Sequence, residues 1–209
     1  SVVVDVFFPT AVVSAVAKAF ARQFPLTPLR LFVEGLGAAY LPVLDGRCSL
    51  GILTPLPQTF PSLVSERLGE LPLVAVASAC HPLANFSHRI PRRELAKYVQ
   101  LVLTDRSDLT VGRDFGVASP STWRLADLST KYAFLKDCVG WGGMPLHMVE
   151  KDIAAGTLVV LDVDEMPRTG FMLTMSAFHR PSQPPGPAGK WFVDHLKTLW
   201  EQDDVVQVL

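Results

Sequence analysis

Hydrophobic and polar residues follow two different periods between residues 1 and 54. Runs of β-branched and aromatic residues with the length of strands are separated by segments in which apolar side chains recur at helical spacing. The pattern predicts strands at Val2–Phe8, Leu29–Glu34 and Ser49–Leu53 and helices at 10–24 and 37–45. Strands that alternate with helices in this way predict parallel pairing with right-handed crossovers.

The alternation returns in the middle of the chain, after β-like runs at Leu63–Leu68 and Leu71–Ala79. The second run, "LPLVAVASA", is almost entirely apolar, which is typical of a strand buried on both faces. The elements predicted beyond it are strands at Val99–Leu103, Thr122–Ala126, Trp141–Met144 and Leu158–Asp162, helices at 129–139 and 145–155, an apolar run at 170–178, a Pro-rich linker at 180–187 and a last helix at 188–202.

The two long apolar runs, 71–79 and 170–178, each lie between one α/β segment and the next. If they pair, they connect a first lobe, made from the start and the end of the chain, to a second lobe made from its middle. The expected boundaries are 1–76 and 177–209 for the first lobe and 77–176 for the second. This is the layout of two-lobed small-molecule binding proteins, in which a ligand occupies the cleft at the carboxyl ends of parallel strands.

Composition and charge narrow the possible functions. The chain has 209 residues, of which 49% are hydrophobic and 19% charged, as in folded globular domains. Its formal net charge is −1, and the largest cluster of basic residues is the pair Arg92-Arg93. This chain by itself is therefore a poor candidate for binding DNA phosphates or an anionic membrane surface. Apolar runs fall short of the ~20 residues that span a bilayer.

The cysteine pattern predicts a reducing compartment. Cys48, Cys80 and Cys138 are an odd number, are widely scattered and form no CxxC motif, so we expect no disulfide framework and three small apolar residues in buried positions. A cytoplasmic location follows as an expectation. The chain begins at Ser1 without a methionine, so the absence of a visible signal peptide carries limited weight.

The segment "GWGG" (140–143) is the most conspicuous glycine cluster. A dinucleotide-binding loop needs a strand, then GxGxxG, then a helix that opens on the pyrophosphate. Here a predicted helix precedes Gly140, the spacing is GxGG, and a Walker lysine does not follow. The pattern favours a helix end followed by small residues where packed backbones run close together.

Five segments in order resemble the effector-binding domain of LysR-type transcriptional regulators. They are "FARQFPLTPLRLFVEG", "LPVLDGRCSLGIL", "LVAVASACHPLA", "TWRLADLSTKYAFLKDCVGWG" and "GWGGMPLHMVEKDIAAGTLVVL". Each segment alone is a weak match to the family, but the order and spacing of all five are specific. The resemblance covers nearly the whole chain. One departure is Ser49, which stands where an aspartate is usual in the family.

The resemblance implies a periplasmic-binding-protein-like α/β fold with two Rossmann-like lobes joined by two crossing strands. It implies a sensor of a small-molecule effector that needs no cofactor and contacts DNA only through an N-terminal winged helix-turn-helix domain, which this chain lacks. It also implies a homodimer or tetramer in which helix 10–24 and elements near 35–50 pair across copies.

Candidate ligand-binding residues lie where strands end and helices begin, because helix amino termini offer free N–H groups and the positive end of the dipole. Helix starts at Pro9-Thr10, Asp127–Ser129 and Pro145 are expected to converge and to suit a carboxylate. The first-lobe candidates are Phe8, Pro9, Thr10, Leu36 and Thr54. For Thr10 the alternative is a plain helix cap.

The second-lobe candidates gather in the segment "LTDRS" and on neighbouring elements. Arg106 could form a bidentate pair with a carboxylate, or be an exposed loop arginine. Asp127 could contact the ligand or cap the helix that follows it. The second-lobe candidates are Ser78, Thr104, Arg106, Ser107, Trp123 and Asp127. Phe7, Phe8, Leu36 and Trp123 around these polar groups suggest a carboxylate ligand with an apolar or aromatic body.

Two rival functions use the same fold. A solute receptor of a transporter would have no DNA partner, and an enzyme would need paired acid–base or nucleophilic groups in the cleft. The sequence contains no HExxH, HxxxH or GxSxG motif, and His147 with Glu150 is a helical pair that often occurs by chance. The sequence therefore predicts a non-enzymatic sensor without a metal.

Overall fold

The computed structural model describes residues 1–164, 166 and 168–201, in two compact units. Unit 1 comprises Ser1–Leu71, Asp105–Val111 and Leu173–Leu209, and unit 2 comprises Pro72–Thr104 and Gly112–Met172. Residues 202–209, which include the end of the predicted helix 188–202 and of the predicted first lobe, lie outside the described residues. The segment 105–111, expected in the second lobe, belongs to unit 1.

Apart from the segment 105–111, the chain passes from one unit to the other within two long strands, β4 and β9. β4 runs from Val64 to Ser78 and β9 from Phe171 to His179. The two crossing strands predicted from the apolar runs are thus confirmed. The runs at 63–68 and 71–79, predicted as separate strands, are one continuous strand because Gly69 and Glu70 stay extended.

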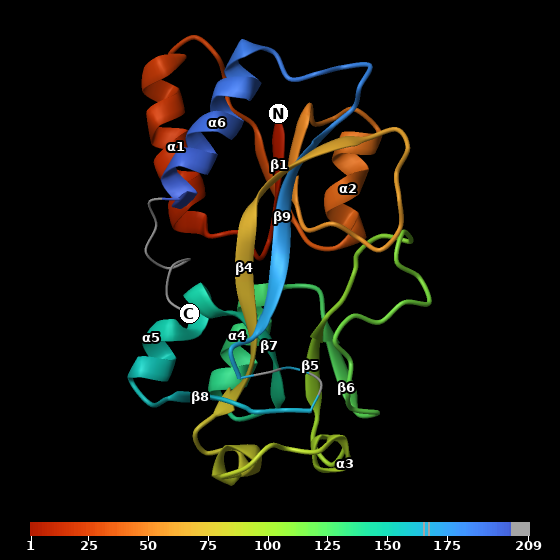
Figure 1. Ribbon diagram of the computed structural model, residues 1–209, viewed down its shortest axis with the longest axis vertical. Coiled ribbons are helices and arrows are strands. Elements are labelled where there is room, and N and C mark those ends of the chain that lie inside the picture. Colours follow the sequence, from red (N-terminus) through yellow and green to blue (C-terminus); the bar gives the residue numbers. More distant parts are fainter. Residues whose placement is uncertain (165, 167, 202–209) are drawn as a thin grey trace. The chain divides into compact units, whose positions relative to one another are not determined.

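Unit 1 is an α/β layer structure (Figure 1). Its other elements are β1 (Val2–Asp5), α1 (Thr10–Gln23), β2 (Leu31–Glu34), α2 (Gly37–Leu44), β3 (Leu50–Leu53) and α6 (Pro187–Glu201). β1 pairs in parallel with β2 and β3, and β9 pairs antiparallel with β3. Helices α1 and α6 lie side by side in Figure 1.

Alternation along β1 explains how the helices of unit 1 divide between the sheet faces. Val2 and Val4 belong to a core cluster that contains buried residues of α1 and α6. Val3, which points to the opposite face, belongs to a cluster with Tyr40 and Val43 of α2. β1 and β3 are therefore buried on both faces, as their apolar sequences predict, whereas the edge strand β2 is largely exposed.

Unit 2 repeats the parallel arrangement. It contains the end of β4, η1 (Pro82–Asn85), α3 (Arg92–Leu95), β5 (Gln100–Leu103), β6 (Thr122–Leu125), α4 (Leu128–Lys136), β7 (Trp141–Pro145), α5 (Leu146–Ala154) and β8 (Leu158–Val160). β5 pairs in parallel with β6 and β7, whereas β4 pairs antiparallel with β7 and β8. The short helices η1 and α3 were not predicted.

The prediction about the cysteines is wrong for two of the three. Cys80, just after β4, and Cys138, just after α4, form a disulfide with their Cα atoms 6.3 Å apart. Cys80 is exposed, whereas Cys48 is free and buried as expected. The sequence gives no local sign of this disulfide, because 58 positions separate the two cysteines. The cysteine count therefore no longer argues for a reducing compartment.

The glycines of "GWGG" are needed for close packing. A Cβ atom at Gly140 would lie 2.4 Å from the carbonyl oxygen of Val99, and one at Gly142 would lie 2.5 Å from that of Leu101. Both distances are far below van der Waals contact, so neither position accepts a side chain without a backbone shift. The interpretation of this segment as small residues beside a packed backbone is confirmed.

Among the described residues, no helix has the length and apolar character that a membrane crossing requires.

Candidate functional site

The carboxyl ends of β1, β2 and β3 form one edge of unit 1, because the three strands run parallel. Asp5 is the last residue of β1, Leu36 precedes α2 after β2, and Thr54 follows β3. Carboxyl edges of this kind are where α/β folds bind ligands. The fold thus brings Leu36 and Thr54, both predicted from the sequence, to the same edge.

Asp5 is a buried carboxylate at this edge that the sequence analysis missed. It is 4% exposed and accepts hydrogen bonds from Phe7 N (2.9 Å) and Thr54 N (3.4 Å). The bond to Phe7 turns the chain, so β1 ends at Asp5 and not at Phe8 as predicted. Burial raises the pKa of Asp5 to about 6, against a smaller lowering by the two backbone bonds.

This burial predicts a distinct pH dependence of stability. The native state holds the Asp5 proton more tightly than the unfolded chain does, so Asp5 makes the free energy of unfolding fall as pH rises from its ordinary pKa of 3.8 to about 6. The expected fall is roughly 3 kcal/mol, from about 1.4 kcal/mol per unit of pKa. Urea unfolding of the wild type and Asp5→Asn at several pH values measures it.

The matched control is Asp194→Asn, which changes an exposed aspartate on α6. The difference in unfolding free energy between wild type and Asp5→Asn should change with pH between 4 and 6. The corresponding difference for Asp194→Asn should stay constant. A constant difference for both variants would contradict the prediction.

Thr54 is held by its backbone and by its side chain. Its carbonyl oxygen accepts a hydrogen bond from the Tyr40 hydroxyl (3.0 Å), which in turn accepts one from Leu56 N (3.2 Å). Burial raises the pKa of Tyr40 to about 12, so this hydroxyl keeps its proton at neutral pH. The Thr54 hydroxyl contacts the sulfur of Met175 at 3.2 Å. Thr54 is thus a fixed part of the edge.

The amino terminus of α2 is occupied by the chain's own carboxylate. Asp105 accepts hydrogen bonds from Gly37 N (3.1 Å) and Ala38 N (3.0 Å), the free N–H groups of the first turn. Leu36, the residue before this turn, has a backbone φ of 54°, a left-handed conformation that leucine rarely adopts. An added Cβ at Gly37 would lie 2.4 Å from Asp105 Oδ2, so only glycine fits against the carboxylate.

The loop that carries Asp105 is arranged around the same carboxylate. Ser107 donates to it from its backbone N (2.9 Å) and its hydroxyl (3.0 Å), and the Thr110 hydroxyl donates at 2.6 Å. Ser107, predicted to touch the ligand, therefore supports Asp105. Arg106 pairs with Glu34 at 2.6 Å, so its guanidinium is engaged with a carboxylate of unit 1.

The three candidates in the turn before α1 have different surroundings. Phe8 is 2% exposed and packs edge-on against Trp200, with ring centroids 4.7 Å apart, so it belongs to the core and not to an aromatic pocket wall. Pro9 is buried and precedes the helix. Thr10 is exposed and is the first residue of α1, so it is not the helix cap considered as its alternative.

The second-lobe candidates are spread over unit 2. Asp127 caps α4 by accepting a hydrogen bond from Thr130 N (2.7 Å), which confirms the capping alternative and fills this helix start. Trp123 is 49% exposed on β6. Thr104 follows β5 and donates from its backbone to Leu125 O (2.9 Å). Ser78 is buried at the end of β4, with its hydroxyl 3.5 Å from Thr157 O.

Lys131 is a buried cation packed against β7 of unit 2, and the sequence analysis missed it. It is 4% exposed, on the face of α4 that also carries Leu128 and Leu135. Its ammonium donates a hydrogen bond to Gly143 O at 2.7 Å, and its Cε lies 3.2 Å from a Cβ built on Gly142. Burial lowers the pKa of Lys131 to about 8.

The missed residues left signals in the sequence. Asp105 stands two residues before Ser107, a spacing that favours local side-chain to backbone bonds. Lys131 lies three residues after Leu128 and four before Leu135, at the helical spacing of one apolar face. Asp5 interrupts a run of apolar residues. Lys131 and Asp5 are thus charged residues at positions that the pattern assigns to the interior.

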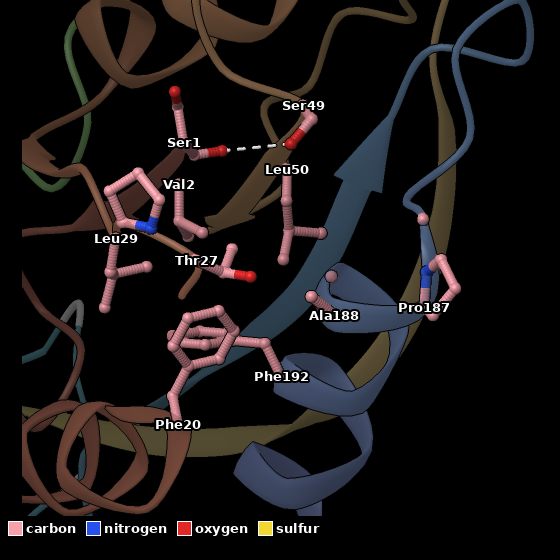
Figure 2. Close-up of a pocket in the computed structure, with 13 residues that line it drawn as sticks. Ser1, Val2, Phe20, Thr27, Leu29, Ser49, Leu50, Pro187, Ala188 and Phe192 are labelled. Atoms are coloured by element: carbon pink, nitrogen blue, oxygen red, sulfur yellow. Dashed lines mark hydrogen bonds between the residues drawn. The ribbon is translucent and has the colours of Figure 1, made fainter. Parts of the chain in front are cut away.

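A cavity of about 230 Å³ lies at the opposite end of the unit 1 strands (Figure 2). Its walls include Phe20 of α1 and Phe192 of α6, which face each other. The hydrogen bond between Ser1 and Ser49 lies at one rim of the cavity. This cavity contains none of the candidate ligand-binding residues. It is therefore distinct from the carboxyl edge. Among the described residues, no cluster of His, Cys, Asp or Glu could hold a metal ion.

Two α/β units, each with parallel strands that end at a polar edge, define a two-lobed ligand-binding domain. The chain belongs to the LysR family: the model of the LysR substrate binding domain matches residues 1–201. The periplasmic-binding-protein-like fold predicted from the sequence is confirmed.

Comparisons with known proteins agree with this family. The chain is 27% identical over 182 residues to the HTH-type transcriptional regulator CbbR of Sinorhizobium medicae (strain WSM419), and equally to CbbR of Rhizobium meliloti (strain 1021). The match covers 84% of this chain but 57% of each relative, so the chain spans little more than half their length.

Solved structures of two other proteins have the same fold. The effector binding domain of QuiR in complex with shikimate has a TM-score of 0.72 at 15% identity, covering 97% of this chain and 96% of that one. The regulatory domain of CcmR from Synechocystis PCC6803 in complex with 2-PG has a TM-score of 0.75 at 18% identity, covering 95% of each.

Proposed function

We propose that this chain is the ligand-sensing part of a LysR-type transcriptional regulator, and that it binds a small carboxylate at the carboxyl edges of its parallel strands. The observation that carries the proposal is the family match over residues 1–201. The complex of the QuiR domain with shikimate, a small carboxylate, supports the ligand class. Ligand binding then alters DNA binding by the full-length protein. The position of the ligand in a cleft between lobes stays a prediction.

We also propose that the domain forms a homodimer through α1 and β2. β2 is an edge strand of the described sheet, and Leu31, Phe32 and Val33 on it are 40%, 39% and 54% exposed. An exposed apolar edge strand is a surface that proteins usually cover. A monomer in analytical ultracentrifugation would contradict this part of the proposal.

Thermal unfolding with a panel of ligands tests the ligand class. Benzoate and shikimate are compared with their methyl esters, which lack the negative charge. An acid at 100 times its Kd should raise the free energy of unfolding by about 2.7 kcal/mol, and its ester should give a much smaller change. Stabilisation by sugars, amines or metal ions alone would show that the carboxylate assignment is wrong.

A further inference from the structure

The cavity of about 230 Å³ lies wholly within unit 1 and has a buried apolar floor (Figure 2). Phe20 of α1, Leu50 of β3 and Phe192 of α6 form this floor, and they are 5%, 1% and 1% exposed. At the rim of the cavity, Thr27 and Pro187 are exposed. The lining therefore extends from the core of unit 1 to its surface, so that a small molecule can enter.

Small residues around the start of α6 leave this space open. Ala188 lines the cavity from the first turn of the helix, and Gly186 lines it just before the helix begins. A Cβ atom built on Gly186 has no neighbour within 4 Å, so the lining is not tightly packed there. Protein interiors contain few voids larger than a water molecule, because the atoms that line a void lose contacts. A bound apolar molecule would restore those contacts.

The polar groups of the cavity suit an uncharged ligand. No described residue that lines it has an ionisable side chain, and an ion moved onto the apolar floor would lose its hydration without gaining a partner. The Thr27 hydroxyl lies on the cavity side in Figure 2. The Ser49 hydroxyl donates to Ser1 O at 3.1 Å and keeps lone pairs that can accept a hydrogen bond. These groups suit one hydroxyl on an otherwise apolar molecule.

The volume and the aromatic rings define the size and shape of the ligand. A cavity of about 150 Å³ lined by aliphatic and aromatic side chains binds benzene. Drug-sized ligands need roughly 300 Å³ or more, so the unit 1 cavity fits one ring with a short substituent. The rings of Phe20 and Phe192 have centroids 6.1 Å apart and an interplanar angle of 70°. A third ring can extend this edge-to-face arrangement.

We propose that this cavity is a second ligand-binding site, which takes a small uncharged aromatic molecule that carries one hydroxyl group. The ring packs against Phe20 and Phe192, and the hydroxyl group forms hydrogen bonds with Thr27 and Ser49. The site goes beyond the proposed function, because it lies at the opposite end of the strands from the carboxyl edge and selects a neutral ligand. Each site can therefore be wrong without the other.

NMR titration of ¹⁵N-labelled residues 1–209 with phenol tests the site. We expect saturable shifts of the amide signals of Thr27, Ala188 and Gly189. Ala188 packs against the core cluster of unit 1, so Ala188→Leu places a larger side chain in the cavity and should abolish phenol binding. Ala21→Leu, at an exposed position of α1, is the matched control and should bind phenol as the wild type does. Shifts that do not saturate, or equal binding by Ala188→Leu, would overturn the proposal.

A second variant, Thr27→Val, tests the hydrogen bond without disturbing the core, because Thr27 is exposed and valine has a similar shape. It should weaken phenol binding about fivefold, because one hydrogen bond is lost. Binding of toluene, which has no hydroxyl group, should stay unchanged. An equal effect of Thr27→Val on the two compounds would overturn the assignment of the hydroxyl group.

Benzyl alcohol and benzoate separate this site from the carboxyl edge, because they differ in charge and little in size. Benzyl alcohol should shift the amide signals of Ala188 and Gly189, and benzoate should not. Stabilisation by benzoate that persists in Ala188→Leu belongs to the carboxyl edge and supports the proposed function. Benzoate that binds in the cavity as tightly as benzyl alcohol would overturn the selection of an uncharged ligand.

Discussion

Reduction of the Cys80–Cys138 disulfide is expected to lower the free energy of unfolding by about 4 kcal/mol, because it frees a loop closed across 58 positions in the unfolded chain. Equilibrium urea unfolding with and without a phosphine reductant measures this. Alkylation of the denatured chain should add one group before reduction, at Cys48, and three groups after it.

Two variants control this experiment. Cys80→Ser cannot form the bond, so its unfolding should not respond to the reductant. Cys48→Ser keeps the bond and should respond as the wild type does. An unchanged unfolding midpoint for the reduced wild type, or three alkylated cysteines before reduction, would show that the bond does not form in solution.

Replacement of Asp105 by alanine is expected to cost roughly 3–5 kcal/mol, since it removes a carboxylate on which five donors converge. The orphaned groups include the first N–H groups of α2, which no other side chain caps. Asp105→Asn should cost less, because its amide oxygen still accepts some of these bonds. Urea unfolding of both variants measures the two costs.

A chemical rescue makes this prediction sharper. Formate or acetate can enter the space left by Asp105→Ala and should raise the melting temperature of that variant more than that of the wild type. Asp108→Ala, at an exposed position of the same loop, is the matched control and should change the unfolding free energy by less than about 0.5 kcal/mol. A rescue of the control to the same extent would mean that the effect is not specific.

The sequence indicated where several candidate residues lie in the fold, but it did not reveal the buried charges beside them. Leu36, Thr54 and Asp127 were named from their places at strand ends and helix starts, and the fold puts each of them there. Phe8 was assigned to a pocket wall, but the contact with Trp200, from the far end of the chain, makes it a core residue. A pattern of neighbours along the chain does not contain such a contact.

The sequence by itself determined the alternation of strands and helices, the two long crossing strands and the family, because these depend on periodicity and on segments of contiguous residues. Only the tertiary structure decided which charges are buried and what they face. Asp105 reaches Gly37 across 68 positions, and Cys80 reaches Cys138 across 58. Such partners meet through chain folding, and the free energy of a buried charge depends on the partner and not on its place in the sequence.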